Sequence, residues 1–238
     1  MRILRKIKSR IDHIGMYYVR KVCSREFRHQ TFTSVNERPI EFAFLFRQLV
    51  NIWPKKILDV GTGMTSLPHL MRNCGFHVTA IDNINDYWPA GMVNRHYHVL
   101  NDDITQTTLT SSYEVITCIS VLEHIKEHRE AIKSMYKLLV PGGRLILTCP
   151  YNEDQYVQNV YELPESPVKN KLSFVTQAFS RCELNLWLED TSFQVIEQEY
   201  WEFFDGEYWT CGERIVPPRR VEVHNRHQLT CLLLKKPK

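Results

Sequence analysis

The sequence contains no run of about 18–20 apolar residues, the length that a helix needs to span a bilayer. Its N-terminal segment is basic but lacks a continuous apolar core and a small-residue cleavage site, so we expect no secretory signal. The seven cysteines form no Cys-x-x-Cys pair, which argues against a structural zinc site. Their odd number, and the apolar surroundings of Cys118, Cys149 and Cys231, favour a reducing, cytoplasmic compartment.

The chain also has no net basic charge outside one segment. Residues 1–28 carry nine Lys and Arg and two acids, whereas the rest of the chain carries 21 basic and 25 acidic residues. Nucleic-acid enzymes usually gather basic residues around the face that holds the active site. The acidic body therefore argues against a nucleic-acid partner. The 238 residues suffice for one large domain with a small appendage.

Residues 1–36 are predicted to form a basic, amphipathic helical segment, followed by a domain over residues 37–238. Apolar residues recur at intervals of three and four, a spacing that forms one stripe along a helix. The stripe consists of Ile3, Ile7, Ile11, Ile14, Tyr18 and Val22. Residues 1–25 could lie on an anionic membrane or contact a phosphate-bearing molecule. Alternatively, the stripe docks on the body while the basic side faces water, and we favour this second interpretation.

From residue 37 onward, predicted helices and strands alternate. We predict helices over residues 37–50, 65–73, 126–139 and 177–191. We predict strands over residues 56–60, 78–82, 97–100, 115–120, 144–149, 193–203 and 228–235. This order predicts an α/β fold with a doubly wound, mostly parallel seven-strand sheet and a C-terminal antiparallel hairpin. The irregular segment 150–176, which contains several prolines, is predicted to be a lid over an acceptor site.

A glycine loop follows the first predicted strand, in the sequence KKILDVGTGMTSLPHLM. Gly61 and Gly63 have no Cβ, so their backbone N–H groups can approach a ligand closely at the start of a helix. Ser66 stands where a dinucleotide-binding Gly-x-Gly-x-x-Gly motif requires glycine, and the Gly-Lys-Ser/Thr of a Walker A loop is absent. By itself, the pair of glycines could equally form a tight turn.

Acidic residues follow the next two predicted strands. Asp82 ends the second strand, where a carboxylate can accept hydrogen bonds from both ribose hydroxyls of an adenosine. Asp103 follows the third strand. Alone, Asp82 would be better explained as an acid in a surface turn. Together with Asp59 and the two glycines, it indicates a nucleoside-binding site.

The order of these motifs resembles the class I, seven-strand Rossmann-like methyltransferases that use S-adenosylmethionine. The resemblance covers residues 56–151 through the motifs DVGTG, AIDN, NDDI, ITCISVLEHI and LLVPGGRLILTCPY. LEHI and PGG are similar to the small-molecule branch that includes ubiquinone-biosynthesis and sugar O-methyltransferases. The segment NERPIEFAFLF resembles enzymes of glycan-modification clusters. S-adenosylmethionine is the implied cofactor, and the adjacent acids Asp102 and Asp103 are better explained by contacts with adenine than by a metal.

The resemblance implies a set of cofactor-binding residues: Asp59, Gly61, Thr62, Gly63, Asp82, Asn83, Asp103, Ile104, Ser120 and Val121. The two glycines would line the methionine moiety. Asp59 would fix the loop or reach the amino group through a water molecule. Ser120 and Val121, just past the fourth strand, would lie under the methionine.

The same resemblance assigns the adenosine end of the cofactor. Asp82 would hold the ribose, with Asn83 beside the adenine. Asp103 would meet the adenine amine, and Ile104 would pack on the ring. Thr65 stands where the family often has a third glycine, and we expect it to cap the following helix.

His124 follows the fourth strand, at the mouth where the resemblance puts the methyl group. Transfer to a hydroxyl requires alignment of the acceptor and removal of its proton, and histidine is the usual base near neutral pH. We predict that His124 is this base or orients the acceptor, and that Glu123, Tyr151 and Tyr156 bind the acceptor. Alternatively, Glu123 and His124 only shape the pocket, or His124 caps a helix.

The aromatic segment YWEFFDGEYWT, residues 200–210, could stack on a sugar or form the core of the C-terminal hairpin, and the core is the better explanation for Phe203. We expect methyl transfer to a small-molecule or glycan acceptor, above all to a hydroxyl of a sugar or related metabolite. The alternatives are an N- or C-methyltransferase of a small metabolite and a non-catalytic S-adenosylmethionine-binding module. Ser66 and the Glu123-His124 pair disfavour a nicotinamide dehydrogenase. The expected location is the cytoplasm, with peripheral membrane contact as an option.

Overall fold

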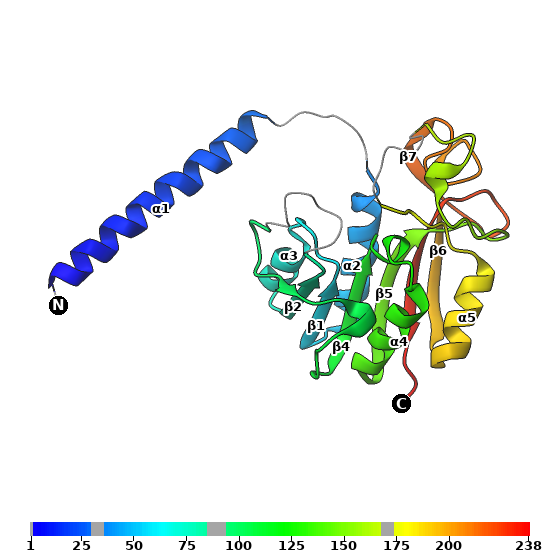
Figure 1. The fold of residues 1–238 in the computed structure, drawn as a ribbon, viewed down its shortest axis with the longest axis horizontal. Coiled ribbons are helices and arrows are strands. Elements are labelled where there is room, and N and C mark those ends of the chain that lie inside the picture. The colour runs from blue at the N-terminus through cyan, green and yellow to red at the C-terminus, as the bar shows by residue number, and fades with distance from the viewer. Residues whose placement is uncertain (1, 30–35, 85–93, 168–173) are drawn as a thin grey trace. The chain divides into compact units, whose positions relative to one another are not determined.

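The computed structural model describes residues 2–29, 36–84, 94–167 and 174–238. The chain divides into two compact units, Met1–Glu37 and Arg38–Lys238. Helix α1 (Arg2–Arg28) makes up most of the first unit, as the apolar spacing predicts, and is drawn in blue in Figure 1. Among the described residues, no helix is both long enough and apolar enough to cross a membrane.

Within the described residues, the second unit contains an eight-stranded sheet with the order β3-β2-β1-β4-β5-β8-β6-β7. Its strands are β1 (Lys56–Val60), β2 (His77–Asp82), β3 (Leu100–Asn101), β4 (Tyr113–Ile119), β5 (Leu139–Pro150), β6 (Gln194–Phe204), β7 (Arg214–Val221) and β8 (Leu229–Lys235). The strands from β3 to β5 are parallel to one another. β8 runs antiparallel to both β5 and β6. The predicted α/β fold, with a mostly parallel sheet and a C-terminal antiparallel pair, is confirmed.

The prediction of seven strands is wrong, because β7 is an additional strand between the last two predicted ones. Its sequence, RIVPPRRV, contains Pro217 and Pro218, and proline is excluded from the interior of a sheet because it has no N–H to donate. β7 is compatible with these prolines because it lies at the edge and pairs only with β6. The third strand is also displaced and occupies Leu100–Asn101 rather than residues 97–100.

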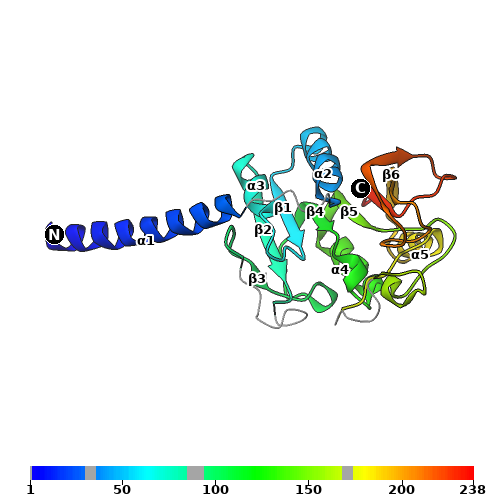
Figure 2. The ribbon, with the colours of Figure 1, turned by 90° about the horizontal axis from the view of Figure 1, so that it is seen from above.

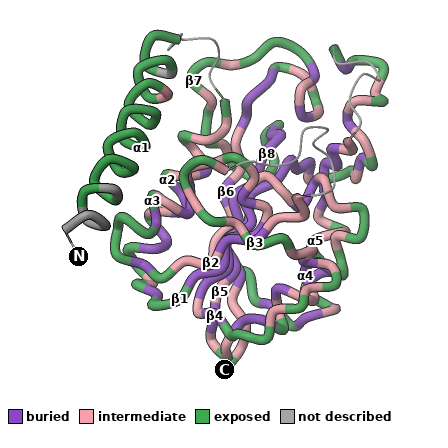
Figure 3. Tube along the Cα trace, turned by 60° about the vertical axis from the view of Figure 1, so that its left-hand side comes forward, coloured by how far each residue is buried: buried purple, intermediate pink, exposed green. Residues whose placement is uncertain are grey.

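Helices cover both faces of the sheet, as Figure 2 shows. The helices α2 (Arg38–Ile52) and α3 (Leu67–Asn73) pack on one face, and α4 (His128–Leu138) and α5 (Arg181–Thr191) pack on the other. Successive residues of β1 point to opposite faces, so Ile57 joins the core under α2 while Leu58 joins the core under α4. The central strands are accordingly buried on both faces, purple in Figure 3.

The helices α3, α4 and α5 are shorter than predicted; for α4 and α5, neighbouring residues have other roles. α5 begins at Arg181, rather than at residue 177, after a capping box formed by Ser180 and Glu183. The predicted first residue, Gln177, instead donates its backbone N–H to the carbonyl of Glu123 at 2.9 Å. α4 ends at Leu138, and residues 141–143, which were expected to end it, lie inside β5.

Candidate cofactor and acceptor site

The glycine loop connects β1 to α3 and is tied to the end of β2. The N–H groups of Gly61 and Thr62 donate to the carbonyl of Ile81, at 2.9 and 3.2 Å. Gly61 and Gly63 both have left-handed backbone conformations, with φ of +71° and +55°. A Cβ atom on Gly61 would overlap both γ-methyl groups of Val121. The fold therefore requires glycine at position 61, and Val121 closes the underside of the loop.

Asp59 lies beneath the loop and is buried. Its carboxylate accepts hydrogen bonds from the hydroxyls of Thr62 and Thr117, at 2.6 Å each. Burial raises the pKa of Asp59 to about 6, since the charged form loses its hydration. Of the two roles that the resemblance implies for Asp59, these contacts favour fixing the loop. The buried side chain of Thr62 has the same structural role, and its predicted contact with a cofactor stays a prediction.

Asp82, at the end of β2, meets the glycine loop directly. Its Oδ2 accepts a hydrogen bond of 2.5 Å from the backbone N–H of Gly63. Asn94 closes the loop from the other direction, because its side-chain amide donates to the carbonyls of Gly63 and Thr65 at 2.9 Å each. The sequence analysis did not single out Asn94, since no motif surrounds it. Asn83, the neighbour of Asp82, is half-buried.

The expectation that Thr65 caps the next helix is wrong. α3 begins at Leu67, and its N-cap is Ser66, whose side chain makes no capping hydrogen bond. The hydroxyl of Thr65 donates instead to the carbonyl of Thr62 at 2.8 Å, within the glycine loop. A side-chain cap is less needed here because Pro68, in the first turn, has no N–H to satisfy.

Asp103 and Ile104 have structural roles after β3. Oδ1 of Asp103 accepts hydrogen bonds from the N–H and hydroxyl of Thr105, at 2.9 and 2.8 Å, and so begins the short 3-10 helix η1 (Ile104–Gln106). Ile104 is buried in the core under α4. Their predicted contacts with an adenine ring stay predictions.

A buried carboxylate connects α2 to the ends of β4 and β5. Oε1 of Glu41 accepts hydrogen bonds from the hydroxyls of Ser120 and Thr148, at 2.5 and 2.6 Å. Its Oε2 accepts one from Arg38 at 2.9 Å, and Arg38 also donates to the carbonyl of Ile119 at 3.3 Å. Ser120, predicted to lie under the methionine, is thus held at the carboxyl end of β4.

Arg38 and Glu41 are candidates that the sequence analysis missed. They lie three residues apart in the first turn of α2, so their side chains meet on one helix face. The Glu41 side chain is fully buried, whereas that of Arg38 is 31% exposed. The pair therefore presents a cation, not a carboxylate, at the carboxyl end of β4. The only signal was the resemblance of NERPIEFAFLF to glycan-modifying enzymes, which assigns no role to either residue.

His124 ends the short 3-10 helix η2 (Leu122–His124), directly after β4. Its Nδ1 lies 2.8 Å from the carbonyl oxygen of Val175. Because a carbonyl only accepts hydrogen bonds, Nδ1 carries the hydrogen and Nε2 is the basic nitrogen. Burial lowers the pKa of His124, which keeps the ring neutral near pH 7. The ring of Phe174 packs against it edge to face, with centroids 5.2 Å apart.

The end of the predicted lid is anchored beside His124. The side-chain amide of Gln177 donates to the carbonyls of Glu123 and Ile125, at 3.2 and 2.8 Å. Tyr156 donates its hydroxyl to Oε1 of Gln177 at 2.6 Å. Two of the three residues predicted to bind the acceptor, Glu123 and Tyr156, are therefore brought together around Gln177.

Tyr151, the third of these residues, lies apart from them. Its ring is buried under α5, and its hydroxyl donates to Glu153 at 3.0 Å. In the aromatic segment 200–210, Phe203 is fully buried and its ring meets that of Trp209 with centroids 5.5 Å apart. Phe203 thus forms core, as the sequence favours.

The chain matches the family model described as a methyltransferase domain over residues 27–198, and it belongs to that family. Its curated relatives include ubiquinone biosynthesis O-methyltransferases. The one from Hydrogenovibrio crunogenus is 29% identical over 116 residues, which cover 46% of this chain and 47% of the relative. The one from Pseudomonas syringae pv. syringae is 28% identical over 160 residues, 61% and 67% of the two chains. The chain spans about half the length of the first curated relatives it matches.

Solved structures, a methyltransferase among them, share the fold. The 1,6-didemethyltoxoflavin-N1-methyltransferase of Burkholderia thailandensis, solved with S-adenosylhomocysteine, has a TM-score of 0.57 and 13% identity, covering 95% of this chain and 90% of its own. TehB from Haemophilus influenzae has a TM-score of 0.52 and 18% identity, covering 86% and 63%. The chain thus belongs to a methyltransferase family and has the α/β fold of a methyltransferase solved with S-adenosylhomocysteine, so the predicted family and fold are confirmed.

Proposed function

We propose that the protein binds S-adenosylmethionine at the glycine loop and transfers its methyl group to a hydroxyl of a small molecule, such as a sugar or related metabolite. The contact between Asp82 and Gly63 carries the proposal, because it sets a carboxylate suited to ribose hydroxyls beside the half-buried backbone of the glycine loop. The names of the curated relatives, which are O-methyltransferases, support a hydroxyl acceptor.

The residues of the loop fit this cofactor. Among the described residues, a Cβ on Gly63 would have one atom within 4 Å, the Oδ2 of Asp82 at 4.0 Å, so these residues leave the backbone open on that side. Asp82 would hold the ribose. Arg38 offers the partly exposed cation that a methionine carboxylate needs, at the end of β4. Glu41, which is buried behind it, fixes the position of that cation.

S-adenosylmethionine supplies a methyl group that its sulfonium already activates. The protein must align the acceptor oxygen with that methyl group and take up the hydroxyl proton. We assign proton removal to Nε2 of His124, because the carbonyl of Val175 holds Nδ1–H and the lowered pKa keeps the ring neutral. Glu123 and Tyr156 both hydrogen-bond Gln177, at the end of the predicted lid, and would border the acceptor.

Two measurements test the proposal in order. Calorimetry with S-adenosylmethionine tests the cofactor, and a screen of nucleotide sugars, glycan termini and hydroxylated metabolites, read out as S-adenosylhomocysteine release, tests the acceptor. We expect the wild-type protein to bind S-adenosylmethionine and the Gly61→Ala variant not to bind it. No binding at millimolar cofactor would reject the enzyme. Turnover with amine or carbon acceptors alone would reject O-methylation.

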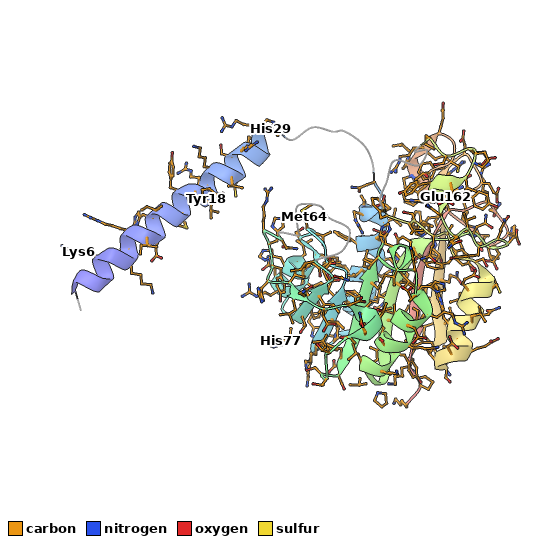
Figure 4. All side chains as sticks on the ribbon, in the orientation of Figure 1. Lys6, Tyr18, His29, Met64, His77 and Glu162 are labelled. Carbon is orange, nitrogen blue, oxygen red and sulfur yellow. The ribbon has the colours of Figure 1, made fainter. Side chains whose placement is uncertain are left out.

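For α1 we propose the other of the two interpretations, the one that the sequence alone favours less: the helix attaches the protein to an anionic membrane surface facing the cytoplasm. Three members of the apolar stripe, Ile11, Ile14 and Tyr18, are 63%, 70% and 69% exposed. Exposed basic side chains such as Lys6 and Lys21 line the same helix; Figure 4 labels Lys6 and Tyr18. An apolar stripe flanked by basic residues is the pattern of a helix that lies in a membrane interface. Such a helix would bring the enzyme to a lipid-linked or phosphate-bearing acceptor.

A further inference from the structure

A cavity separate from the glycine loop lies among the loops that follow β5 and precede β8. Its volume is about 560 Å³, and it is lined by Asn152, Glu207 and residues 223–227, among others. The side-chain amide of Asn152 donates to Oε1 of Glu207 at 3.0 Å, which joins two of its walls. The strands β1, β4 and β5 are parallel, so their carboxyl ends lie on the same side of the sheet. The loop after β5, which lines this cavity, and the glycine loop after β1 therefore lie on that side.

His227 forms part of the cavity wall and is 3% exposed. Its Nδ1 lies 2.6 Å from the carbonyl oxygen of Asn225, so Nδ1 carries the hydrogen and Nε2 is a hydrogen-bond acceptor. Nε2 is buried and has no hydrogen-bond partner among the described residues. Burial lowers the pKa of His227, so the ring is neutral near pH 7. A buried acceptor of this kind calls for a donor from outside the protein.

The imidazole of His227 is fixed in its orientation. It stacks on the ring of Tyr151 with centroids 5.7 Å apart and an interplanar angle of 12°, and the ring of Tyr200 lies at 4.7 Å. Arg181 links Tyr200 to Glu153, because it donates one hydrogen bond to the hydroxyl of Tyr200 and one to the carboxylate of Glu153, at 2.8 Å each. The basic nitrogen is therefore preorganised, as a binding site requires.

The charges around the cavity select the type of ligand. Glu153 is paired with Arg181, and Arg226 is paired with Glu202 at 2.8 Å. The Glu207 carboxylate, which has a hydrogen bond from Asn152, and the neutral His227 imidazole then offer acceptor atoms to a ligand. Acceptors bind hydrogen-bond donors, and a carboxylate repels anions. Neutral hydroxyl groups meet both conditions, whereas phosphate or carboxylate groups do not.

We propose that this cavity is a subsite for a neutral, polyhydroxylated part of the methyl acceptor, such as a sugar ring, and that one of its hydroxyls donates to Nε2 of His227. This inference rests on the proposed function, of which it names the substrate class. His227 acts here as a binding residue, while the transfer chemistry stays with His124. The volume lies within the range of small-molecule sites, about 300–1,000 Å³.

The test follows the imidazole nitrogens of His227 by ¹⁵N NMR in the full chain. The probes are the methyl glycosides of glucose, galactose and mannose, with glucuronate as the anionic counterpart. We expect a saturable shift of the Nε2 resonance with at least one glycoside and none with glucuronate. His227→Gln should weaken glycoside binding about tenfold, the worth of one good hydrogen bond. His77→Gln, at an exposed position at the start of β2, is the matched control and should change nothing.

Calorimetry with S-adenosylmethionine on the same samples separates the two proposals. If the cofactor binds but no glycoside moves Nε2, the cavity holds only water and the subsite is rejected while the proposed function stands. If glycosides bind but the cofactor does not, the proposed function fails. Should His227→Gln not fold, Glu207→Gln replaces it, since it preserves size and the bond to Asn152. Unchanged glycoside affinity in Glu207→Gln would also overturn the subsite.

Discussion

The hydroxyl of Ser120 donates a hydrogen bond of 2.5 Å to the carboxylate of Glu41, which lies 79 positions earlier in the chain. Ser120 has a left-handed backbone, with φ of +51°, at the point where β4 ends. Non-glycine residues seldom adopt this conformation, so neighbouring contacts must hold it. The bond to Glu41 is one such contact, and it couples the position of α2 to the floor of the cofactor site.

Replacing Glu41 tests this coupling. Glu41→Gln leaves Arg38 without its charge partner and weakens the bonds from Ser120 and Thr148. We expect the free energy of unfolding to fall by about 2–4 kcal/mol, as for loss of a buried partner. Urea denaturation measures this change in the free energy of unfolding, and Glu222→Gln, at an exposed position, is the control. Equal stability of the two variants would contradict the role of Glu41.

Gly61→Ala should abolish cofactor binding, because the new methyl group would overlap the side chain of Val121 and deform the loop. In the described part of the chain, the methyl group of Gly63→Ala comes no closer than 4.0 Å to a neighbouring atom, so this change should disturb the fold less while still weakening binding through its left-handed backbone. The double variant Gly61→Ala/Val121→Ala removes the closest overlaps and should recover part of the lost thermal stability. No recovery would show that Val121 is not the cause.

His124→Ala should lower kcat for a hydroxyl acceptor about 10²–10⁴-fold, the usual worth of a general base. KM should change little. In the wild-type enzyme, kcat should fall as the pH drops through the lowered pKa of His124, which lies below the ordinary value of 6.5. His98→Ala, at an exposed position, is the matched control. Near-normal turnover in His124→Ala would remove the catalytic role, and a mild loss would favour an amine acceptor.

Asp59 should make stability depend on pH. Its pKa is raised from 3.8 to about 6, so the folded state binds a proton more tightly than the unfolded state. Stability should therefore decrease as the pH rises from about 4 to 6, by a total on the order of 3 kcal/mol. Urea denaturation across this range should show the decrease in the wild-type protein and a flatter profile in Asp59→Asn. Identical profiles would contradict the raised pKa.

The helix α1 should bind anionic vesicles through its apolar stripe. We expect cosedimentation with vesicles that contain phosphatidylserine, weakened by high salt, and little with neutral phosphatidylcholine. Replacing Ile11 and Ile14 with serine should reduce binding at least about tenfold. Met16→Ser, which removes an equally exposed apolar side chain outside the stripe, is the control. Equal binding to both vesicle types would reject the proposal.

Most of the fold was predictable because its signals are local. Apolar runs and helical spacing identified seven of the strands, since each pattern depends on a few neighbouring residues. β7 was missed because Pro217 and Pro218 argue against a strand unless that strand lies at an edge. Edge position is a property of the whole sheet. The start of α5 was predicted too early for a similar reason, because the backbone N–H of Gln177 donates to the carbonyl of Glu123, which is distant in sequence.

The sequence by itself determined the class of the protein and the composition of its glycine loop, because motif order and the backbone freedom of glycine are written in consecutive residues. Only the tertiary structure decided which side chains meet. It joined Asp82 to Gly63, bonded Glu41 to Ser120, and set His227 against the rings of Tyr151 and Tyr200. Such contacts join segments that lie far apart in the chain, and the packing of the complete sheet brings those segments together.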